Sequence, residues 1–187
     1  MPVIVITPPA EEPVSLDQAA RQLRISSSAD DMLLESRRAP ARAWAEHETG
    51  RQFMDAVLEL RMDSWPSGRV IELPRPPLKA VSSVKYLDAD GVEQTMPADA
   101  YHVDASGMKG RVVLASGHAW PTLADQPGAV RIRFSAGYGG AKDVPQEAVA
   151  AMLLHIQAAH LGEADTHGGY MEAARRCLDP LRVMEVA

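Results

Sequence analysis

The spacing of hydrophobic positions changes twice along this chain. Apolar residues recur every three or four positions in the first quarter, alternate with polar residues through the middle, and return to the first spacing near the end. A spacing of three and four indicates one buried face of a helix, and alternation indicates a half-buried strand. The pattern predicts an α+β fold, in which a bundle of about four helices (residues 15–50 and 144–181) carries an inserted small antiparallel β module (residues 53–135).

The first helix is signalled by Ser15-Leu16-Asp17-Gln18. Ser15 is the expected N-cap, and Gln18 reaches back to it as in a capping box. One apolar stripe follows at helical spacing. Its residues are Leu16, Ala19, Ala20 and Leu23.

A second, longer helix is predicted to begin after a cap at Ser28 and to end at Gly50, which suits the C′ position. Pro40 falls inside it, where a proline costs roughly 3 kcal/mol, so a kink is expected there. The face predicted to be buried consists of Leu33, Ser36, Pro40, Ala43, Trp44 and His47.

Alternation begins after Phe53, where Leu58, Leu60 and Met62 are separated by charged residues. The proline-rich run 73–78 predicts a stiff, extended edge segment. Asp88-Ala89-Asp90-Gly91 predicts the turn of a hairpin, because Gly91 tolerates a positive φ. The remaining strands are expected at residues 70–73, 81–87, 92–96, 101–103, 111–114 and 130–134.

Two helices are expected to close the chain. Asp143-Val144-Pro145-Gln146 has the form of a capping box and predicts the start of the first. Its buried face should comprise Val149, Met152, Leu153, Ile156 and His160. After a flexible joint at Gly168-Gly169, a last stripe consists of Met171, Ala174, Leu178 and Leu181.

The two ends lie outside this frame, as an N-terminal arm (residues 1–14) and a C-terminal tail (residues 182–187). Val3 to Ile6 predicts a short strand or arm that pairs with something, and another subunit is one candidate partner. With four consecutive apolar residues, early prolines and no basic segment, the N-terminus is expected to be neither a signal peptide nor a membrane span.

Composition narrows the function classes. Of 187 residues, 46% are hydrophobic and 24% charged, which is typical of a globular chain. The net charge of -6 argues against a protein that coats nucleic acid, because such binding rests on clustered Lys and Arg. The one cysteine, Cys177, excludes an internal disulfide and is interpreted as a packed small hydrophobe.

The search for chemistry predicts no catalytic, cofactor-binding or metal-binding residue, and therefore no enzyme. His155 and His160 lie five residues apart, about 140° around a helix, so they cannot share a metal. The Asp88–Gly91 turn lacks calcium-loop spacing. Gly137-Tyr138-Gly139-Gly140 lacks the spacing of a phosphate loop.

Two other function classes stay open at this point. A carbohydrate- or peptide-binding β module would use a groove near Trp65 and Trp120. A hydrolase using His118 or His155 has the least support. Arg75 and Lys79 beside the prolines fit a solvated edge, and also fit a rigid docking surface.

Several segments, taken together and in order, resemble the head-tail connector (adaptor) proteins of long-tailed bacteriophages and their prophages. The resemblance spans nearly the whole chain and rests on the ordered set. The segments are 13–19, 23–25, 45–51, 73–78, 81–91, 101–104, 134–139 and 143–145.

The resemblance implies a non-enzymatic ring, commonly of twelve copies in that family, beneath the portal vertex. Its partners would be the portal protein, a stopper (head-completion) or tail protein, and further copies of itself. DNA would pass through the channel without specific binding, and no membrane or cofactor would take part. The chain would be made in the host cytoplasm and reside in the neck of the virion. The candidate protein contacts are Val3, Ile4, Val5, Ile6, Arg75, Pro76, Pro77, Met171, Leu178 and Leu181.

Overall fold

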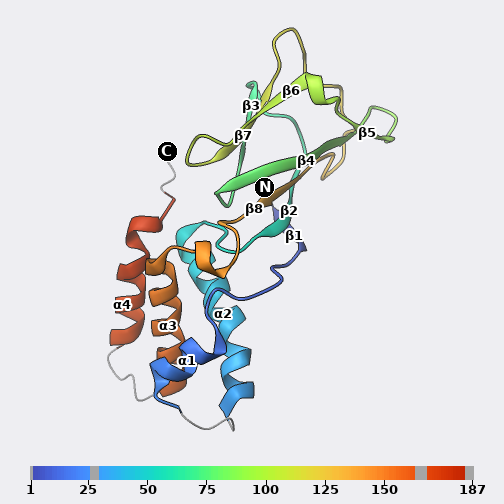
Figure 1. Ribbon diagram of the computed structural model, residues 1–187. Helices are drawn as coiled ribbons and strands as arrows, with labels where there is room; N and C mark the ends of the chain where they lie inside the picture. Colours follow the sequence, from blue (N-terminus) through green and yellow to red (C-terminus); the bar gives the residue numbers. More distant parts are fainter. Residues whose placement is uncertain (1, 26–29, 163–167, 184–187) are drawn as a thin grey trace. The chain divides into compact units, whose positions relative to one another are not determined.

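The computed structural model describes residues 2–25, 30–162 and 168–183. The chain divides into two compact units. The β unit comprises Met1–Pro8 and Asp55–Gly137, and the helical unit comprises Pro9–Met54 and Tyr138–Ala187. Helices and antiparallel sheets thus occupy separate units, so the predicted α+β class is confirmed (Figure 1).

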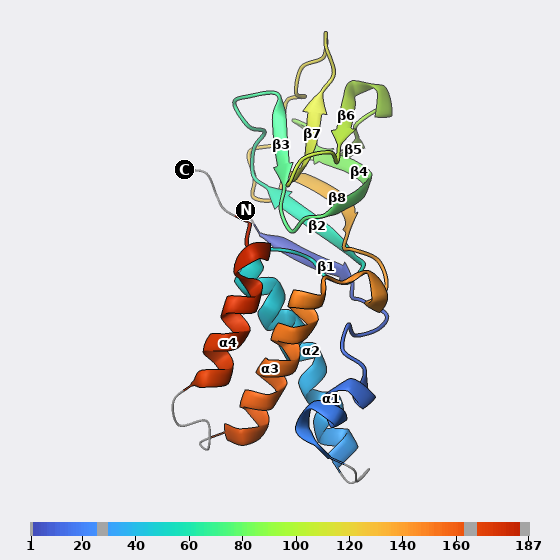
Figure 2. The same cartoon turned by 60° about the vertical axis from the view of Figure 1, so that its left-hand side comes forward.

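The helical unit contains four α-helices, with α3 packed against both α2 and α4 (Figure 2). The first begins as the sequence predicts. Ser15 Oγ accepts a hydrogen bond from the Gln18 amide at 3.1 Å, and Gln18 Oε1 accepts one from the Ser15 amide at 2.8 Å. The helices are α1 (Leu16–Leu23), α2 (Asp31–Thr49), α3 (Gln146–Leu161) and α4 (Gly169–Leu178).

The buried face of α2 differs from the predicted one. Leu33 is exposed, and so are Ser36, Pro40, Ala43 and His47, while Trp44 is half-buried. Small side chains let two helix backbones approach closely, and that advantage outweighs the bulk that guided the prediction. The buried residues are Leu34, Ala41, Ala45, Glu46 and Thr49.

The ends of α2 are partly as expected. Gly50 is the C-cap with φ 69°, and its amide donates to the Glu46 carbonyl at 2.9 Å. The helix runs through Pro40 without interruption. Asp30 is the N-cap, and the expected cap Ser28 lies outside the described residues.

The start of α3 is also corrected. Pro145 is its N-cap, and Asp143 makes no capping box with Gln146. The Asp143 carboxylate instead accepts a hydrogen bond from the Gly140 amide at 2.9 Å, where a short 3-10 turn, η3 (Ala141–Asp143), begins. On the face of α3, Val149, Met152 and Ile156 are buried as predicted, Leu153 is half-buried and His160 is exposed.

The β unit consists of two antiparallel sheets. The larger has the strand order β1-β2-β8-β4-β5, and the smaller has the order β3-β7-β6. The strands are β1 (Val3–Thr7), β2 (Ala56–Met62), β3 (Val70–Leu73), β4 (Leu78–Leu87), β5 (Glu93–Thr95), β6 (Tyr101–Asp104), β7 (Gly110–Leu114) and β8 (Val130–Ala136).

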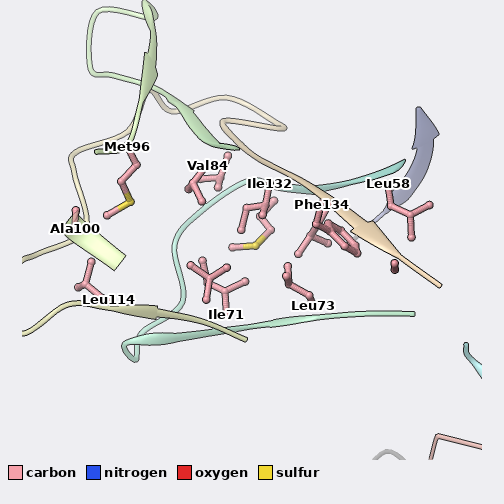
Figure 3. Packing of buried hydrophobic residues seen from close by; sticks show 14 of the residues in the cluster. Leu58, Ile71, Leu73, Val84, Met96, Ala100, Leu114, Ile132 and Phe134 are labelled. Atoms are coloured by element: carbon pink, nitrogen blue, oxygen red, sulfur yellow. The ribbon is translucent and has the colours of Figure 1, made fainter. Parts of the chain in front are cut away.

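The hydrophobic core of this unit lies between the two sheets (Figure 3). Leu58 of β2, Val84 of β4 and Phe134 of β8 point inward from the larger sheet, and Ile71 and Leu73 of β3 meet them. The predicted alternation of β2 is confirmed on this face. The outward faces of the central strands are therefore left for polar residues.

The proline-rich run 73–78 is not an extended edge segment. Arg75 adopts a left-handed conformation with φ 58°, Pro76 is buried, and the peptide bond before Pro77 is cis. The run connects β3 of one sheet to β4 of the other, so the chain has to bend there. The following hairpin is as predicted, with Gly91 at φ 78°.

The N-terminal segment pairs within its own chain. β1 lies antiparallel to β2, with Ile4 opposite Glu59, and it forms an edge of the larger sheet. The partner left open by the sequence is therefore β2, rather than another subunit, because the edge of β2 provides unpaired backbone groups that β1 satisfies.

Candidate protein-contact surfaces

The free edge of β1 is apolar and solvent-exposed. The exposed fractions of Ile4, Val5 and Ile6 are 36%, 47% and 40%. The Arg61 amide donates to the Pro2 carbonyl at 3.1 Å, so the backbone groups of Pro2 and Ile4 face β2, and those of Val3 and Val5 face outward. An uncharged edge of β-branched residues is a ready template for another chain.

The other predicted contact residues differ in how accessible they are. Arg75 and Pro77 are half-buried, and Pro76 is buried in the bend between the sheets. In the C-terminal segment, Met171 and Leu181 are half-buried, whereas Leu178 is fully buried in the core of the helical unit. In the described structure Leu178 is thus a packing residue, because no part of it reaches the surface.

The C-terminal segment is anchored to the end of α2. After α4 a short 3-10 turn, η5 (Asp179–Leu181), brings the chain back towards Arg51, whose Nε donates to the Leu181 carbonyl at 2.5 Å. The Val183 amide donates to the Thr49 carbonyl at 2.9 Å. Arg182 forms an ion pair with Glu48 at 3.0 Å. These contacts hold the described part of the tail against the helical unit.

A row of three cations crosses the outer face of the larger sheet. Arg61 of β2 lies opposite Arg131 of β8, and Arg131 lies opposite Lys85 of β4. Neighbouring strands are about 4.8 Å apart, so these side chains stand side by side. Arg133, two residues along β8, adds a fourth. We call Arg61, Lys85, Arg131 and Arg133 the cationic face; their side chains are between 39% and 47% exposed.

Two carboxylates lie among these cations. Glu59, only 4% exposed, accepts hydrogen bonds from Arg61 and Arg133, each at 2.9 Å. Burial alone would raise the pKa of Glu59, but the hydrogen bonds and charges of the two arginines outweigh it and hold that pKa below its ordinary value. Glu59 therefore stays ionised.

Glu93 on β5 bridges the other two cations. Its carboxylate contacts Lys85 Nζ at 2.7 Å and Arg131 Nη1 at 3.3 Å. The hydrogen bond from Lys85 and the nearby positive charges lower the pKa of Glu93. Sequence reasoning missed this surface. The sequence shows that Glu59 and Arg61 share one face of their strand, and that Arg131 and Arg133 share one face of theirs. It does not show the register that places the two strands side by side.

Trp65 and Trp120 pack on one another. Their ring centroids are 4.6 Å apart with an interplanar angle of 12°, and Tyr86 lies against Trp65. Trp65 Nε1 donates to the Pro121 carbonyl at 2.9 Å, and Trp120 Nε1 donates to the Gly68 carbonyl at 2.8 Å. The two indole rings thus stack on one another, and their N–H groups bond to backbone carbonyls in the loops of the β unit.

The histidines considered as chemical groups lie apart. His155 stacks on Trp44 at 4.7 Å, and its Nδ1 is buried without a hydrogen-bond partner in the described part of the chain. Burial lowers the pKa of His155. His118 is exposed in a turn of the β unit. Among residues 2–25, 30–162 and 168–183, no group of three or more His, Cys, Asp or Glu is placed to hold a metal ion.

None of the helices within the described ranges is long and apolar enough to span a bilayer.

Solved structures of gene transfer agent particles contain chains that share this fold. The chain matches a chain in the neck of an empty gene transfer agent particle computed with C6 symmetry, at a TM-score of 0.78. It also matches chains in the virion of the native gene transfer agent particle, at 0.76, and in the native neck computed with C12 symmetry, at 0.75. In each case identity is 23%, and the match covers 100% of this chain and 98% of the other.

No protein-family model matches the chain, and neither does a curated protein. The matches show that this chain shares its fold with chains from the neck and virion of gene transfer agent particles, which agrees with the resemblance noted in the sequence.

Proposed function

We propose that this chain is a structural, non-enzymatic protein of the neck of a tailed phage or phage-like particle. The observation that carries the proposal is the full-length correspondence of fold. The match to a chain in the neck of a gene transfer agent particle covers 100% of this chain, and thus both units, and 98% of the other chain. A partial match would leave room for a reused module, and this match leaves little of either chain unaccounted for.

Within the neck, we assign the chain to an adaptor ring between the portal vertex of the capsid and the stopper or tail. The chain offers two units with separate cores and therefore two separate sets of surfaces, which is what a protein with a different neighbour on each side requires. The free edge of β1, the bend at Arg75–Pro77 and the C-terminal segment are the candidate contacts.

A ring of twelve copies fits the symmetry of the matched necks, which were computed with C6 and C12 symmetry. A closed ring of identical subunits needs two different surfaces on each copy, because each contact is head to tail. The ring would enclose a channel for DNA. With a net charge of -6, the chain is suited to letting a duplex pass without holding it.

Cryo-electron microscopy of the particles made by the source genome tests this proposal. Density for the chain is expected as a ring at the neck, between the portal and the stopper. The mass of the purified protein should also rise from that of the free form to that of a ring complex when the portal protein is added. Density in the capsid shell, the tail tube or the tail tip would contradict the assignment, and so would complete necks that lack the chain.

A further inference from the structure

The cationic face carries more positive charge than its own carboxylates balance. Its four cations share Glu59 and Glu93, which leaves an excess of two positive charges. Like charges directly opposite one another on a sheet are destabilising. Yet Arg61, Arg131 and Lys85 follow one another across three strands in a chain whose net charge is -6. The face thus has an unfilled capacity for an anionic partner.

Unpaired carboxylates gather at one end of the same sheet. β2 ends at Met62, opposite Val130, the first residue of β8, so the residues after β2 and before β8 lie at that end. The Gly128 amide donates to Asp63 Oδ1 at 2.7 Å, and the Ala124 amide donates to the Leu87 carbonyl at 3.1 Å. The acidic residues collected there are Asp63, Asp88, Asp90 and Asp125, which we call the acidic rim.

The acidic rim has no cationic partner in the described part of its own chain. Among the described residues, none of the four forms an ion pair within 4 Å. Asp63, Asp90 and Asp125 are exposed. Asp88 accepts hydrogen bonds from Gln94, Val92 and Asp90, which lower the pKa of its carboxyl and keep it ionised.

We propose that the cationic face of one copy binds the acidic rim of a second copy of this chain. The inference rests on the proposed ring and names the surfaces that would join its subunits. A broad face of the sheet in one copy would meet the end of the sheet in the next. Because the two surfaces differ, the contact is heterologous, which is the type that closes into a ring when the rotation fits.

The second copy fits this face better than a nucleic acid does. Glu59 and Glu93 lie among the cations, so a continuous phosphate backbone would meet negative charge along with positive charge. A rim of discrete aspartates can place each carboxylate against one cation. The acidic chain as a whole would also repel a polyanion, whereas the local attraction between face and rim steers two copies together.

Charge reversal on the two surfaces tests the proposal. Lys85→Glu with Arg131→Glu reverses the face, because both side chains are half-exposed and their shared partner Glu93 is at the surface. Asp90→Lys with Asp125→Lys reverses the rim. Arg61 and Arg133 are left alone because they hold the buried Glu59. The mass distribution of the purified protein, from mass photometry and sedimentation at low and high salt, is the readout.

The wild type is expected to associate, and less so as salt rises. Each reversed variant should associate at least about tenfold more weakly. The four-substitution variant should associate again, and so should an equimolar mixture of the two reversed variants, in which each altered surface meets its complement. This recovery is the outcome that no general loss of folding can produce.

The matched control is Lys109→Glu with Arg111→Glu, which changes the net charge by the same amount as the face variant. Lys109 lies just before β7 of the smaller sheet, and Arg111 lies on that strand. Those cations also have carboxylate partners, Glu72 and Asp104. The control should associate like the wild type. The neutral pair Lys85→Gln with Arg131→Gln, checked by thermal unfolding, gives a second test in case the reversed face disturbs the fold.

Several results would overturn the proposal. They are face variants that associate like the wild type, a wild type that stays monomeric at every salt concentration, and a four-substitution variant that fails to recover although it is folded. The face would be assigned to nucleic acid instead if the wild type bound duplex DNA, the face variant did not, and the two proteins had the same mass distribution. None of these removes the neck assignment, which depends on where the chain lies in the particle.

Discussion

The buried carboxylate of Glu46 holds together three segments of the helical unit. It lies on α2, is 6% exposed, and accepts hydrogen bonds from Gln52 Nε2 at 2.7 Å and from the Phe53 amide at 3.1 Å. Arg42 pairs with it at 3.0 Å and also pairs with Glu12 at 2.7 Å. Burial would lower the pKa of Arg42, but the hydrogen bond and charge of Glu12, together with Glu46, raise it. The network ties the segment before α1 to α2 and to the chain that leaves it.

Glu46→Ala is expected to destabilise the protein by about 3 kcal/mol, because it leaves a buried amide and part of a buried guanidinium without partners. Urea unfolding measures this change. The control is Glu172→Ala, which removes an exposed i,i+4 partner of Arg176 and should change the free energy of unfolding by less than about 0.5 kcal/mol. Equal effects of the two substitutions would show that the Glu46 network contributes little.

Asp104 gives the β unit a defined acid sensitivity. Hydrogen bonds from the Ser106 hydroxyl and amide, together with Arg111, lower the pKa of Asp104 to about 2. The pKa of Asp104 in the folded protein lies below the ordinary value of 3.8, so its contribution to stability is present above about pH 4 and is lost as the pH falls towards 2. The melting temperature of Asp104→Asn should fall below that of the wild type at pH 6, and the difference should shrink between pH 4 and 2.

At the level of single residues, local rules worked and distant partners were missed. The capping box at Ser15 and the positive φ of Gly91 depend on neighbours within four positions, and both could be predicted. Glu46 instead accepts a hydrogen bond from the Phe53 amide, and its neighbour Arg42 pairs with Glu12, which lies 30 residues before Arg42. Nothing in a single sequence gives those pairings, because the fold decides which polar groups meet.

Among elements, α4 is held to the bundle by few large side chains. Leu178 is fully buried, and Ala174 one turn earlier is its buried neighbour. Leu178→Ala should cost about 3 kcal/mol, the usual range for a leucine removed from a packed core. Thermal unfolding checks this, with Met171→Ala as the control, since the half-buried Met171 should cost clearly less. An equally small effect at both positions would mean that α4 is only loosely docked.

β1 is expected to matter for the monomer itself. It covers the edge of β2, and Val3 packs on the core of the β unit. Removal of residues 2–8 should therefore lower the free energy of unfolding by roughly 2 kcal/mol, from lost hydrogen bonds and exposed apolar surface. Val5→Lys keeps the strand and adds a charge at the exposed edge, so it should change stability by less than about 0.5 kcal/mol. Full stability of the shortened chain in urea would argue against this role.

The buried face of α2 was predicted wrongly for a simple reason. A helix with Trp44, Leu33 and several alanines offers two stripes of comparable apolarity, displaced by about one residue. The helical period alone does not choose between them. The stripe that faces α3 is the one whose small residues permit close packing, and this depends on the partner helix.

For the molecule as a whole, the positions of the strands could be predicted from the sequence, but their order and register in the sheets could not. Strand positions follow from alternation, and their mutual alignment does not, because non-neighbouring strands such as β2 and β8 pair across a long stretch of sequence. The cationic face exists only through that alignment. A shift of one residue would turn every one of its cations to the other side of the sheet.

The two units are expected to fold independently. Within the helical unit the Tyr138 amide donates to the Phe53 carbonyl at 3.1 Å, so the chain ends left by removing the β unit lie together. A variant in which two glycines replace residues 55–137, and which begins at Pro9, should give a helical circular-dichroism spectrum and cooperative unfolding. Leu178→Ala should cost the same in this variant as in the full chain, because its contacts lie within the helical unit. Non-cooperative melting would show that the helices depend on the sheets.

The closeness of the two crossings between the units has a consequence for how proteins of this fold can diversify. The chain passes into the β unit at Asp55 and out of it at Gly137, and the pair Ala56–Ala136 at one end of the β2–β8 ladder brings those two crossings together. A recombination event with both breakpoints there exchanges an entire sheet domain as a cassette and leaves the bundle intact. Such an exchange would replace the β unit and its surfaces while the helical unit keeps its own core.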